Sequence, residues 1–315
     1  MSTLADVAKK TGLSAMTVSR CFNDAEKVKK DTRELVMQAA KELNYMPNSI
    51  ARSLVRRETK IIFVYIPAGL EISHPFVMQA IAAIGEVLGQ SGYSFLLSRK
   101  FYKNENCDGI IAMGLTIEDE KAFKDLSMKK PAIVFGNSAY FNNWVDVDNY
   151  DGSYQMAEYV FNKGYKDVAY IGIKNTEHFS VQRLKGFSDC AAKYGIDAKI
   201  KLCSNDEQHG YSSAKKILEE RPGVKAIVCA SDLLAMGAMR AAKSKGLSVP
   251  DDIAVTGFDG LGYENIMHPA VTTVAQPVVE VGKILAGKMI EALKTKKPME
   301  KGIFVKPTLK INGSA

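Results

Sequence analysis

The chain has 315 residues, of which 46% are hydrophobic and 24% are charged, and its formal net charge is +7. These values exclude a disordered or fibrous chain and allow two or three globular cores. The N-terminal stretch lacks the apolar core of a secretion signal, and no window approaches the roughly 18 consecutive apolar residues of a membrane span. We therefore expect a cytoplasmic protein with no membrane partner.

The positive charge is concentrated near the N-terminus. Residues 1–60 contain twelve Lys or Arg and seven Asp or Glu, which favours an anionic partner for this segment over a merely solvated surface. The cysteines are scattered and form no CxxC or Cys/His cluster; they are Cys21, Cys107, Cys190, Cys203 and Cys229. We expect them to be reduced and in apolar surroundings, and we expect no metal or cofactor.

The stretch "LADVAKKTGLSAMTVSRCFN" contains two short amphipathic runs. Helical spacing predicts a shared core formed by Leu4, Val7 and Ala8 from the first run and Val18, Cys21 and Phe22 from the second. Gly12 suits the left-handed position after the first helix, and Ser14 suits the N-cap of the second. The two runs therefore predict a pair of helices joined by a tight turn.

The second helix exposes side chains sized for base edges and phosphates, namely Ala15, Met16, Thr17, Ser19, Arg20 and Asn23. The third run, "DTRELVMQAAKELNY", starts with Asp31 and Glu34 at the spacing of a capping-box variant. It is expected to bury Leu35, Ala39 and Leu43. The pattern predicts a DNA-reading helix-turn-helix with a supporting helix, although its periodicity alone also fits a plain three-helix bundle.

These segments, followed by "NYMPN" and "SIARSL", closely resemble the headpiece of the lac repressor family of bacterial transcription regulators. The resemblance implies base reading by Ala15, Met16 and Arg20. It implies backbone-contacting or supporting roles for Thr3, Ser14, Thr17, Ser19, Asn23, Thr32, Tyr45 and Asn48. It also implies that Ala51 and Leu54 of a hinge helix enter the minor groove, where the leucine wedges a base step. We expect the headpiece at residues 1–46 and the hinge at 47–59.

From residue 60 onward, apolar runs alternate with amphipathic stretches. The runs "IIFVYIP", "YSFLLS", "DGIIAMG", "PAIVFGN", "DVAYIGI", "IKLC", "KAIVCA" and "IAVTGFD" predict buried parallel strands. This alternation predicts an α/β fold with doubly wound sheets, and the strands are too many for one sheet. We therefore expect two lobes in the core of residues 60–315. The N-lobe is placed at about 60–148 plus 277–300, and the C-lobe at about 149–276 plus 301–315.

Ligands of open α/β sheets bind beyond the carboxyl ends of the strands. The candidates at such positions are Asn137, Phe179, Arg183, Ser231, Asp232 and Asp259. Each has a structural alternative: Asp232 as a helix cap, Asp259 as a turn former and Phe179 as a packed loop aromatic. Together they describe a pocket with a carboxylate, a guanidinium and an aromatic face, which suits a polyhydroxylated or anionic ligand.

The core also resembles that of the same repressor family, which is similar to periplasmic sugar-binding proteins, through "SHPFV", "VDVDNYDG", "VQRLKGF", "ASDLLAMGAMRAAKSKGLSVPDDIAVTGFDG" and "HPAVTTVAQP". The resemblance implies that Arg183 and Asp259 hold the effector and adds Phe76 to the pocket. Three positions depart from the family pattern. Ser231 stands where Asn is common, Asn137 where Asp is frequent, and Gly260 in place of a second acidic residue.

We expect a non-enzymatic transcription regulator, a repressor that binds a pseudo-palindromic operator as a homodimer under the control of a small-molecule effector such as a sugar or sugar derivative. Regulation by a purine, a nucleoside or a partner protein is an alternative. A solute receptor that does not bind DNA is a further one, disfavoured by the basic headpiece. An enzyme is disfavoured because His74, His178, His209 and His268 form no metal or nucleophile pattern.

One segment departs from the family pattern. Only Lys100 to Asn106 separate "GYSFLLSR" from "CDGIIAMGL", whereas a crossover between parallel strands needs about 10 to 12 residues, usually with a helix. The family's interface helix at this point is expected to be missing, which demands a bare loop or altered strand pairing, or else weakens the fold. We expect a smaller or shifted dimer interface on the first core helix, formed by Met78, Ile81, Ala82, Val87 and Leu88.

Overall fold

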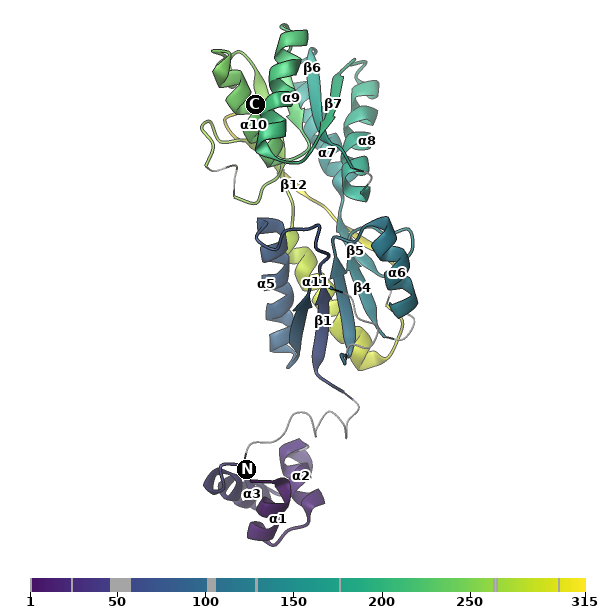
Figure 1. Cartoon of the computed structure of the whole chain (residues 1–315), viewed down its shortest axis with the longest axis vertical. Coiled ribbons are helices and arrows are strands. Elements are labelled where there is room, and N and C mark those ends of the chain that lie inside the picture. Colours follow the sequence, from purple (N-terminus) through teal and green to yellow (C-terminus); the bar gives the residue numbers. More distant parts are fainter. Residues whose placement is uncertain are drawn as a thin grey trace. The chain divides into compact units, whose positions relative to one another are not determined.

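A computed structural model describes residues 2–23, 25–45, 58–100, 106–127, 130–175, 177–262, 264, 266–299 and 301–315. The chain divides into two compact units, Met1–Lys60 and Ile61–Ala315, which are treated separately below. Figure 1 shows a helical N-terminal unit and a larger unit built from two sheets. Among the described residues, no helix combines the length and the apolar character needed to cross a membrane.

The N-terminal unit is a small helical headpiece. Its elements are α1 (Leu4–Thr11), α2 (Ala15–Asn23), a 3-10 turn at Ala25–Lys27 and α3 (Lys30–Glu42). The core combines Val7 and Ala8 of α1, Val18 and Cys21 of α2, and Val36, Ala39 and Ala40 of α3, with Leu4 and Phe22 packed against it. The predicted shared face of the first two helices is confirmed.

The third helix differs from the prediction by about one residue of helical phase. Leu35 is half exposed, and Val36 takes the fully buried position. The helix begins at Lys30, and its N-cap, Lys29, makes no side-chain cap hydrogen bond, so the predicted capping box is wrong. The apolar residues Leu35, Val36 and Leu43 fit two neighbouring faces, and contact with α1 and α2 selects the face that contains Val36.

The first lobe contains a parallel six-stranded sheet in the order β11-β5-β4-β3-β1-β2. Its strands are β1 (Ile61–Tyr65), β2 (Ser94–Ser98), β3 (Gly109–Met113), β4 (Ala132–Phe135), β5 (Trp144–Val147) and β11 (Ile303–Val305). Alternate residues of β1 face opposite sides of the sheet. Ile62 and Val64 contact the layer of α5 (Pro75–Gln90) and α11 (Val278–Thr295), whereas Phe63 and Tyr65 belong to the cluster that includes Phe123. Phe123 lies in α6 (Ile117–Ser127), so both faces of the sheet carry helices.

The second lobe contains a sheet in the order β12-β10-β9-β8-β6-β7, parallel except for the β10–β12 pair. Its strands are β6 (Val168–Ile173), β7 (Lys199–Cys203), β8 (Ala226–Cys229), β9 (Ala254–Asp259), β10 (Thr272–Ala275) and β12 (Thr308–Lys310). The helices are α7 (Asn149–Asn162), α8 (His178–Lys193), α9 (Glu207–Glu220) and α10 (Asp232–Ser244). They pack as the pairs α7/α8 and α9/α10. The predicted α/β class and two sheets are confirmed.

The chain passes between the lobes three times, from β5 to α7, from β10 to α11 and from β11 to β12. The last passage corrects one expected boundary. Residues 301–315 were assigned to the C-lobe, but Ile303–Val305 pairs in parallel with β5 of the first sheet. Only β12, after Pro307, joins the second sheet. Every strand except the antiparallel β12 has its carboxyl end at the edge of its sheet where these passages lie, and a cavity lies there between the lobes.

The short connection after β2 joins two strands that lie on opposite sides of β1. Both β2 and β3 pair with β1 in parallel, so the strand pairing is not altered. Most of the connection, residues 101–105, lies outside the described residues. Phe95 and Leu96 of β2 are 37% and 49% exposed, which leaves apolar surface at this edge of the sheet.

The expected interface residues on α5 fall into two groups. Met78 and Ala82 are exposed, and Ile81 and Val87 are half-buried. Leu88 is fully buried in the core between α5, α11 and the sheet, so its assignment to an interface is wrong. The helix is apolar on nearly all sides, and its sequence alone therefore does not separate the residues of the lobe core from those of an outer surface.

Candidate functional site

The exposed face of α2 carries the predicted base-reading side chains. Met16 is 66% exposed, and Ala15 and Arg20 are also exposed. The helix is held in place from behind by Val18 and Cys21, which are buried. Arg20 makes no hydrogen bond or ion pair with another described residue, so its guanidinium can form the bidentate contact that guanine accepts in a major groove.

The turn before α2 is fixed by two local devices. Gly12 adopts φ +69°, which is the left-handed conformation that glycine tolerates, and its N–H donates to the Ala8 carbonyl. The Ser14 hydroxyl accepts the Thr17 N–H at 3.1 Å and lies 2.9 Å from the Thr17 hydroxyl. The predicted N-cap is confirmed, and it directs the N-terminus of α2, where unpaired N–H groups favour a phosphate, toward solvent.

The other predicted DNA contacts have varied positions. Thr3 is the N-cap of α1 in a capping box with Asp6, and the ring of Tyr45 lies 5.6 Å from that of Phe22. Thr32 lies in the first turn of α3 and is half-buried, and Ser19 is half-buried on α2. Asn23 is the last residue of α2. Asn48, Ala51 and Leu54, including the expected hinge contacts, lie outside the described residues.

A cavity of about 220 Å³ lies between the two lobes. The first lobe and its loops supply Leu70, His74, Phe76, Gly114, Leu115, Glu120, Val134, Phe135, Gly136, Asn137 and Asp146. The second lobe and the connecting segments supply Asn149, Glu177, His178, Phe179, Arg183, Asn205, Asp259 and Gln276. Of the predicted pocket residues, Phe76, Asn137, Phe179, Arg183 and Asp259 line this cavity.

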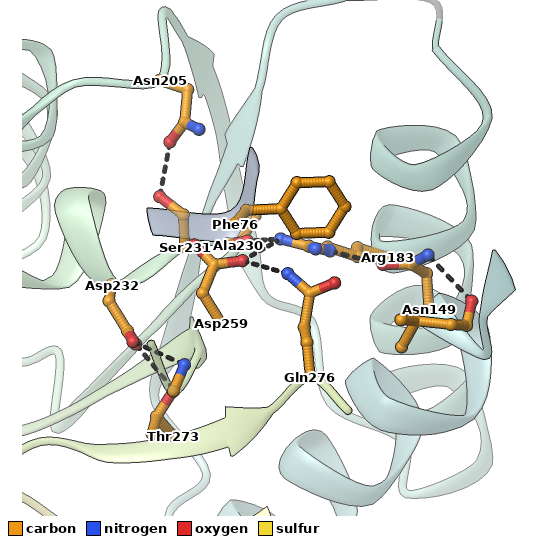
Figure 2. A network of polar contacts seen from close by, with 12 residues as sticks. Phe76, Asn149, Arg183, Asn205, Ala230, Ser231, Asp232, Asp259, Thr273 and Gln276 are labelled. Atoms are coloured by element: carbon orange, nitrogen blue, oxygen red, sulfur yellow. Dashed lines mark hydrogen bonds and ion pairs between the residues drawn. The ribbon is translucent and has the colours of Figure 1, made fainter. Parts of the chain in front are cut away.

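Arg183 of α8 is the central donor of the cavity. It is 4% exposed, its Nε donates to Asn149 Oδ1 at 2.9 Å, and its Nη1 donates to the Ala230 carbonyl at 2.7 Å. The same Nη1 contacts Asp259 Oδ1 at 3.1 Å (Figure 2). The guanidinium carbon lies 3.7 Å from the centre of the Phe258 ring. Nη2 has no partner among the described residues, so this rigidly held cation retains donors for a ligand.

Asp259 ends β9 and faces Arg183. Its Oδ1 also accepts a 2.7 Å hydrogen bond from Gln276, which follows β10 (Figure 2). Burial raises the pKa of Asp259, and the neighbouring guanidinium opposes that rise. Its φ of +131° is unusual for a residue with a side chain, and such backbone strain costs on the order of 1–3 kcal/mol. The Arg183–Asp259 pair expected in the pocket is therefore present as a buried, strained and hydrogen-bonded unit.

Ser231 and Asp232 lie behind the cavity wall and do not line it. Ser231 caps α10 by accepting the Leu234 N–H at 3.2 Å, and its hydroxyl donates to Asn205 Oδ1 at 2.5 Å. The amide nitrogen of Asn205 has no partner among the described residues. A short Ser at position 231 thus positions an amide from the loop after β7, a residue that the sequence reasoning missed.

Asp232 is a structural carboxylate. It accepts Thr273 Oγ1 at 2.6 Å and the Gly260 N–H at 2.8 Å, and it is fully buried (Figure 2). Burial raises the pKa of Asp232, and the charge of Asp259 raises it further. Gly260 has φ +60°, and a Cβ at this position would lie 2.6 Å from the Ala275 backbone. Steric contact with β10 thus accounts for glycine in place of the acidic residue.

The first-lobe wall contains a second buried carboxylate, Asp146 of β5. Its two oxygens accept the N–H groups of Asn137 at 2.9 Å and Val147 at 2.8 Å. Burial raises its pKa from 3.8 to about 6, although these N–H donors oppose the rise. Asn137 is therefore positioned through its backbone, which leaves its side chain to the cavity.

Aromatic residues from both lobes complete the lining. The Phe76 ring packs on Phe135 with a centroid distance of 4.9 Å, and Phe179 lies 5.1 Å from the Arg183 guanidinium. His74 caps α5 by accepting the Phe76 N–H at Nδ1, which leaves its Nε2 to carry the proton. No group of three or more His, Cys, Asp or Glu in the described ranges is arranged to hold a metal ion.

Sequence reasoning missed several lining residues, including Glu120, Asp146, Asn149, Asn205 and Gln276. For Asp146 and Gln276 the missing signal was the strand itself, because neither β5 nor β10 was predicted. Asn205 follows the predicted run "IKLC", and the rule that placed Asn137 also applies to it. Glu120 lies within a helix and carries no such positional signal.

A helix-turn-helix headpiece joined to a two-lobed core with a buried ligand-sized cavity defines a class of proteins that couple DNA binding to a ligand site. Residues 3–48 match the bacterial regulatory proteins of the lacI family, and residues 157–315 match a periplasmic binding protein-like domain. The chain is 35% identical over 316 residues to the uncharacterized HTH-type transcriptional regulator YvdE of Bacillus subtilis. The similarity covers 100% of this chain and 99% of the relative.

Two further similarities also cover nearly the whole chain. The HTH-type transcriptional regulator RegA of Clostridium saccharobutylicum is 31% identical over 322 residues, with 96% of each chain covered. The structure of the lac repressor dimer bound to operator and the anti-inducer ONPF matches with a TM-score of 0.87 and 25% identity, covering 99% of this chain and 98% of that one. The chain belongs to the lacI family of DNA-binding transcriptional regulators.

Proposed function

We propose that the chain is a repressor whose operator affinity is set by a small polyhydroxylated effector, a sugar or sugar derivative, bound in the cavity between the lobes. The observation that carries this proposal is the Arg183–Asp259–Gln276 network at the carboxyl end of β9. It offers a donor and acceptors in one small space, which is the arrangement that vicinal hydroxyl groups require.

The apolar part of the cavity supports the same ligand class. Phe76 and Phe179 present ring edges or faces from opposite lobes, and a sugar ring has an apolar C–H face that packs against aromatic rings. The amides of Asn137, Asn205 and Gln276 add polar contacts on the remaining sides. Binding in this cavity is proposed to be regulatory rather than catalytic.

The DNA side of the proposal assigns base contacts to Ala15, Met16 and Arg20 and phosphate contacts to Ser14 and Thr17. A homodimer would place two such headpieces on inverted half-sites. Exposed Met78 and Ala82 of α5 are proposed to contribute to the dimer interface. The wedge role of Leu54 is part of the same proposal and concerns residues outside those described.

Coupling between the sites is proposed to run through cleft closure. An effector that contacts both lobes favours one lobe arrangement over another, and a ligand shifts an equilibrium only by its differential affinity for the two states. Lining residues come from both lobes, so closure and binding are linked in this cavity.

Two experiments test the proposal. Selection of bound fragments from random DNA should return inverted half-sites, and calorimetric screening against sugars, sugar phosphates, nucleosides and purines should identify a sugar without a phosphate group. Arg183→Ala should weaken that sugar at least tenfold and leave the selected DNA motif unchanged. Recovery of no motif in the presence and absence of effector candidates, or binding of a purine alone, would contradict the proposal.

A further inference from the structure

Glu120 is a buried carboxylate directed into the cavity from the first lobe. It lies in the first turn of α6, whose start is fixed by reciprocal hydrogen bonds between Thr116 and Asp119. The side chain is 3% exposed, and its Oε2 accepts the Ser138 hydroxyl at 2.8 Å. Its Oε1 has no partner among the described residues. Because Glu120 lines the cavity, this oxygen is available to a bound ligand.

The cavity contains more carboxylates than cations. Glu120, Asp146, Glu177 and Asp259 line it, and Arg183 is its sole Lys or Arg among the described lining residues. The charge of Arg183 is already directed at Asp259 at 3.1 Å. A ligand with a phosphoryl or carboxylate group would therefore enter a field that repels it.

The acceptors are not equally occupied. Both oxygens of Asp146 accept backbone N–H groups, whereas Asp259 accepts from Arg183 and Gln276 through Oδ1 alone. Glu177 is exposed at the rim. Of the two first-lobe carboxylates in the lining, Glu120 is therefore the one that combines burial with an oxygen unoccupied by any described residue. A buried carboxylate is disfavoured unless a donor or a cation reaches it. Burial also raises its pKa.

We propose that Glu120 is a specificity-determining residue of the cavity, which accepts a hydrogen bond from a hydroxyl or ammonium group of the effector and rejects phosphorylated and carboxylated ligands. The inference rests on the proposed function of the cavity and adds to it a second, first-lobe carboxylate contact. It also links Glu120 to cleft closure, because an effector bound to both residues would contact Glu120 of the first lobe and Arg183 of the second lobe.

The test uses the full chain and matched sugar sets in calorimetric titrations. Each set is built on one hexose or pentose and contains the free sugar, an amino derivative and a phosphate ester. Glu120→Gln preserves the side-chain shape and removes the charge. Glu118→Gln, at an exposed site in the same turn, is the matched control.

In at least one set, the free or amino sugar should bind to the parent protein, and its phosphate ester should bind at least about tenfold more weakly. Glu120→Gln should weaken the affinity for the preferred ligand by about tenfold, the scale of one charged hydrogen bond. It should also reduce the difference in affinity between that ligand and its phosphate ester. Glu118→Gln should change neither the affinity for the preferred ligand nor this difference. If the parent protein prefers the amino derivative and this preference disappears in Glu120→Gln, the group that donates to Glu120 is an ammonium. If the parent protein binds the free sugar as tightly as the amino derivative or more tightly, the donor is a hydroxyl.

Two failures are distinguishable. A ligand that is weakened by Arg183→Ala but unaffected by Glu120→Gln, or a phosphate ester that binds as tightly as its free sugar, overturns the role of Glu120 and leaves the cavity as an effector site. If no sugar of any set binds, the proposed function fails and the role of Glu120 fails with it.

Discussion

The headpiece and the cavity organise their working residues in opposite ways. On α2, Ala15, Met16 and Arg20 are exposed, and the buried residues Val18 and Cys21 hold the helix in place. In the cavity, Arg183 and Asp259 are buried and bonded both to each other and to further residues. In the headpiece, the side chains proposed to read bases are separate from the folding core, whereas in the cavity the side chains proposed to bind the effector are also part of the buried network.

This difference has a consequence for substitution. A change on the reading face of α2 should affect binding and leave the stability of the fold nearly unchanged. A change in the buried network should affect both, because it leaves another charge or polar group without its partner. Stability and binding measured on the same variants therefore test the comparison directly.

The largest effect is expected from Arg183→Ala. It leaves Asp259 buried and unpaired, and breaking a buried ion pair costs about 3–5 kcal/mol in the free energy of unfolding. This cost is measured by urea unfolding of the full chain, with the unfolding transition of the core, residues 61–315, followed separately from that of the headpiece. Lys185→Ala, which breaks the exposed pair with Asp189 on the same helix, should cost less than about 1 kcal/mol. Equal costs for the two variants would contradict the assignment of a buried network.

The pH dependence of stability should report Asp146. Its pKa is about 6 in the folded chain against an ordinary value of 3.8, so between those values the folded state binds more protons than the unfolded state. Its contribution is most favourable below pH 4 and is lost as the pH rises through 6, by up to about 3 kcal/mol. Thermal unfolding at pH 4 to 7 should show a flatter slope in Asp146→Asn than in the parent. The exposed Asp251→Asn variant should keep the parental slope, and a parental slope in both would refute the assignment.

Arg20→Ala should lose about 1–3 kcal/mol of discrimination between the selected half-site and one with its contacted base changed. The free energy of unfolding should change by less than about 0.5 kcal/mol because the side chain is exposed. Fluorescence anisotropy with paired oligonucleotides measures the discrimination. As a control, Thr17→Ala, at a proposed phosphate contact, should weaken the affinity for both oligonucleotides alike. Undiminished discrimination in Arg20→Ala would remove it from the reading face.

The smallest effect is expected from Ser14→Ala. Loss of the hydroxyl that caps α2 should destabilise the headpiece by about 0.5–2 kcal/mol. Headpiece unfolding, followed by amide exchange of α2, measures this change. Met16→Ala, at an exposed site two residues away, should have no effect on headpiece stability beyond about 0.5 kcal/mol. A larger loss there would show that the proposed base-reading face of α2 is not separate from its folding core.

The sequence predicted those parts of the fold whose signals are local. The headpiece core, Gly12 and the Ser14 cap followed from helical spacing and turn chemistry, and eight strands followed from apolar runs. The prediction that all eight are buried is wrong for the edge strands β2 and β7, which are largely exposed. Strands β5, β10 and β12 were missed because short segments that mix polar and apolar residues, such as "WVDV", carry no clear periodicity, whereas the equally short β4 and β8 are continuous apolar runs. Strand β11 was missed because its apolar run is only three residues long. Position in a sheet, rather than propensity, makes them strands.

The cavity was predictable only where a residue follows a recognised strand. Arg183 and Asp259 were placed together by the family resemblance, and the structure places them 3.1 Å apart. Ser231 was expected in the pocket but lies behind it, since its hydroxyl is used by α10 and Asn205. Glu120 enters the cavity through the packing of α6 on the sheet, which no local pattern of sequence encodes.

The most direct test of effector control is the affinity for a selected operator, measured by anisotropy with and without a saturating sugar identified by calorimetry. Effector control predicts a change in operator affinity of at least about fivefold, the lower end of typical coupling free energies. It also predicts that the change is lost in Arg183→Ala at the same sugar concentration. An operator affinity that stays constant while calorimetry shows the cavity of the parent protein to be filled would contradict effector control.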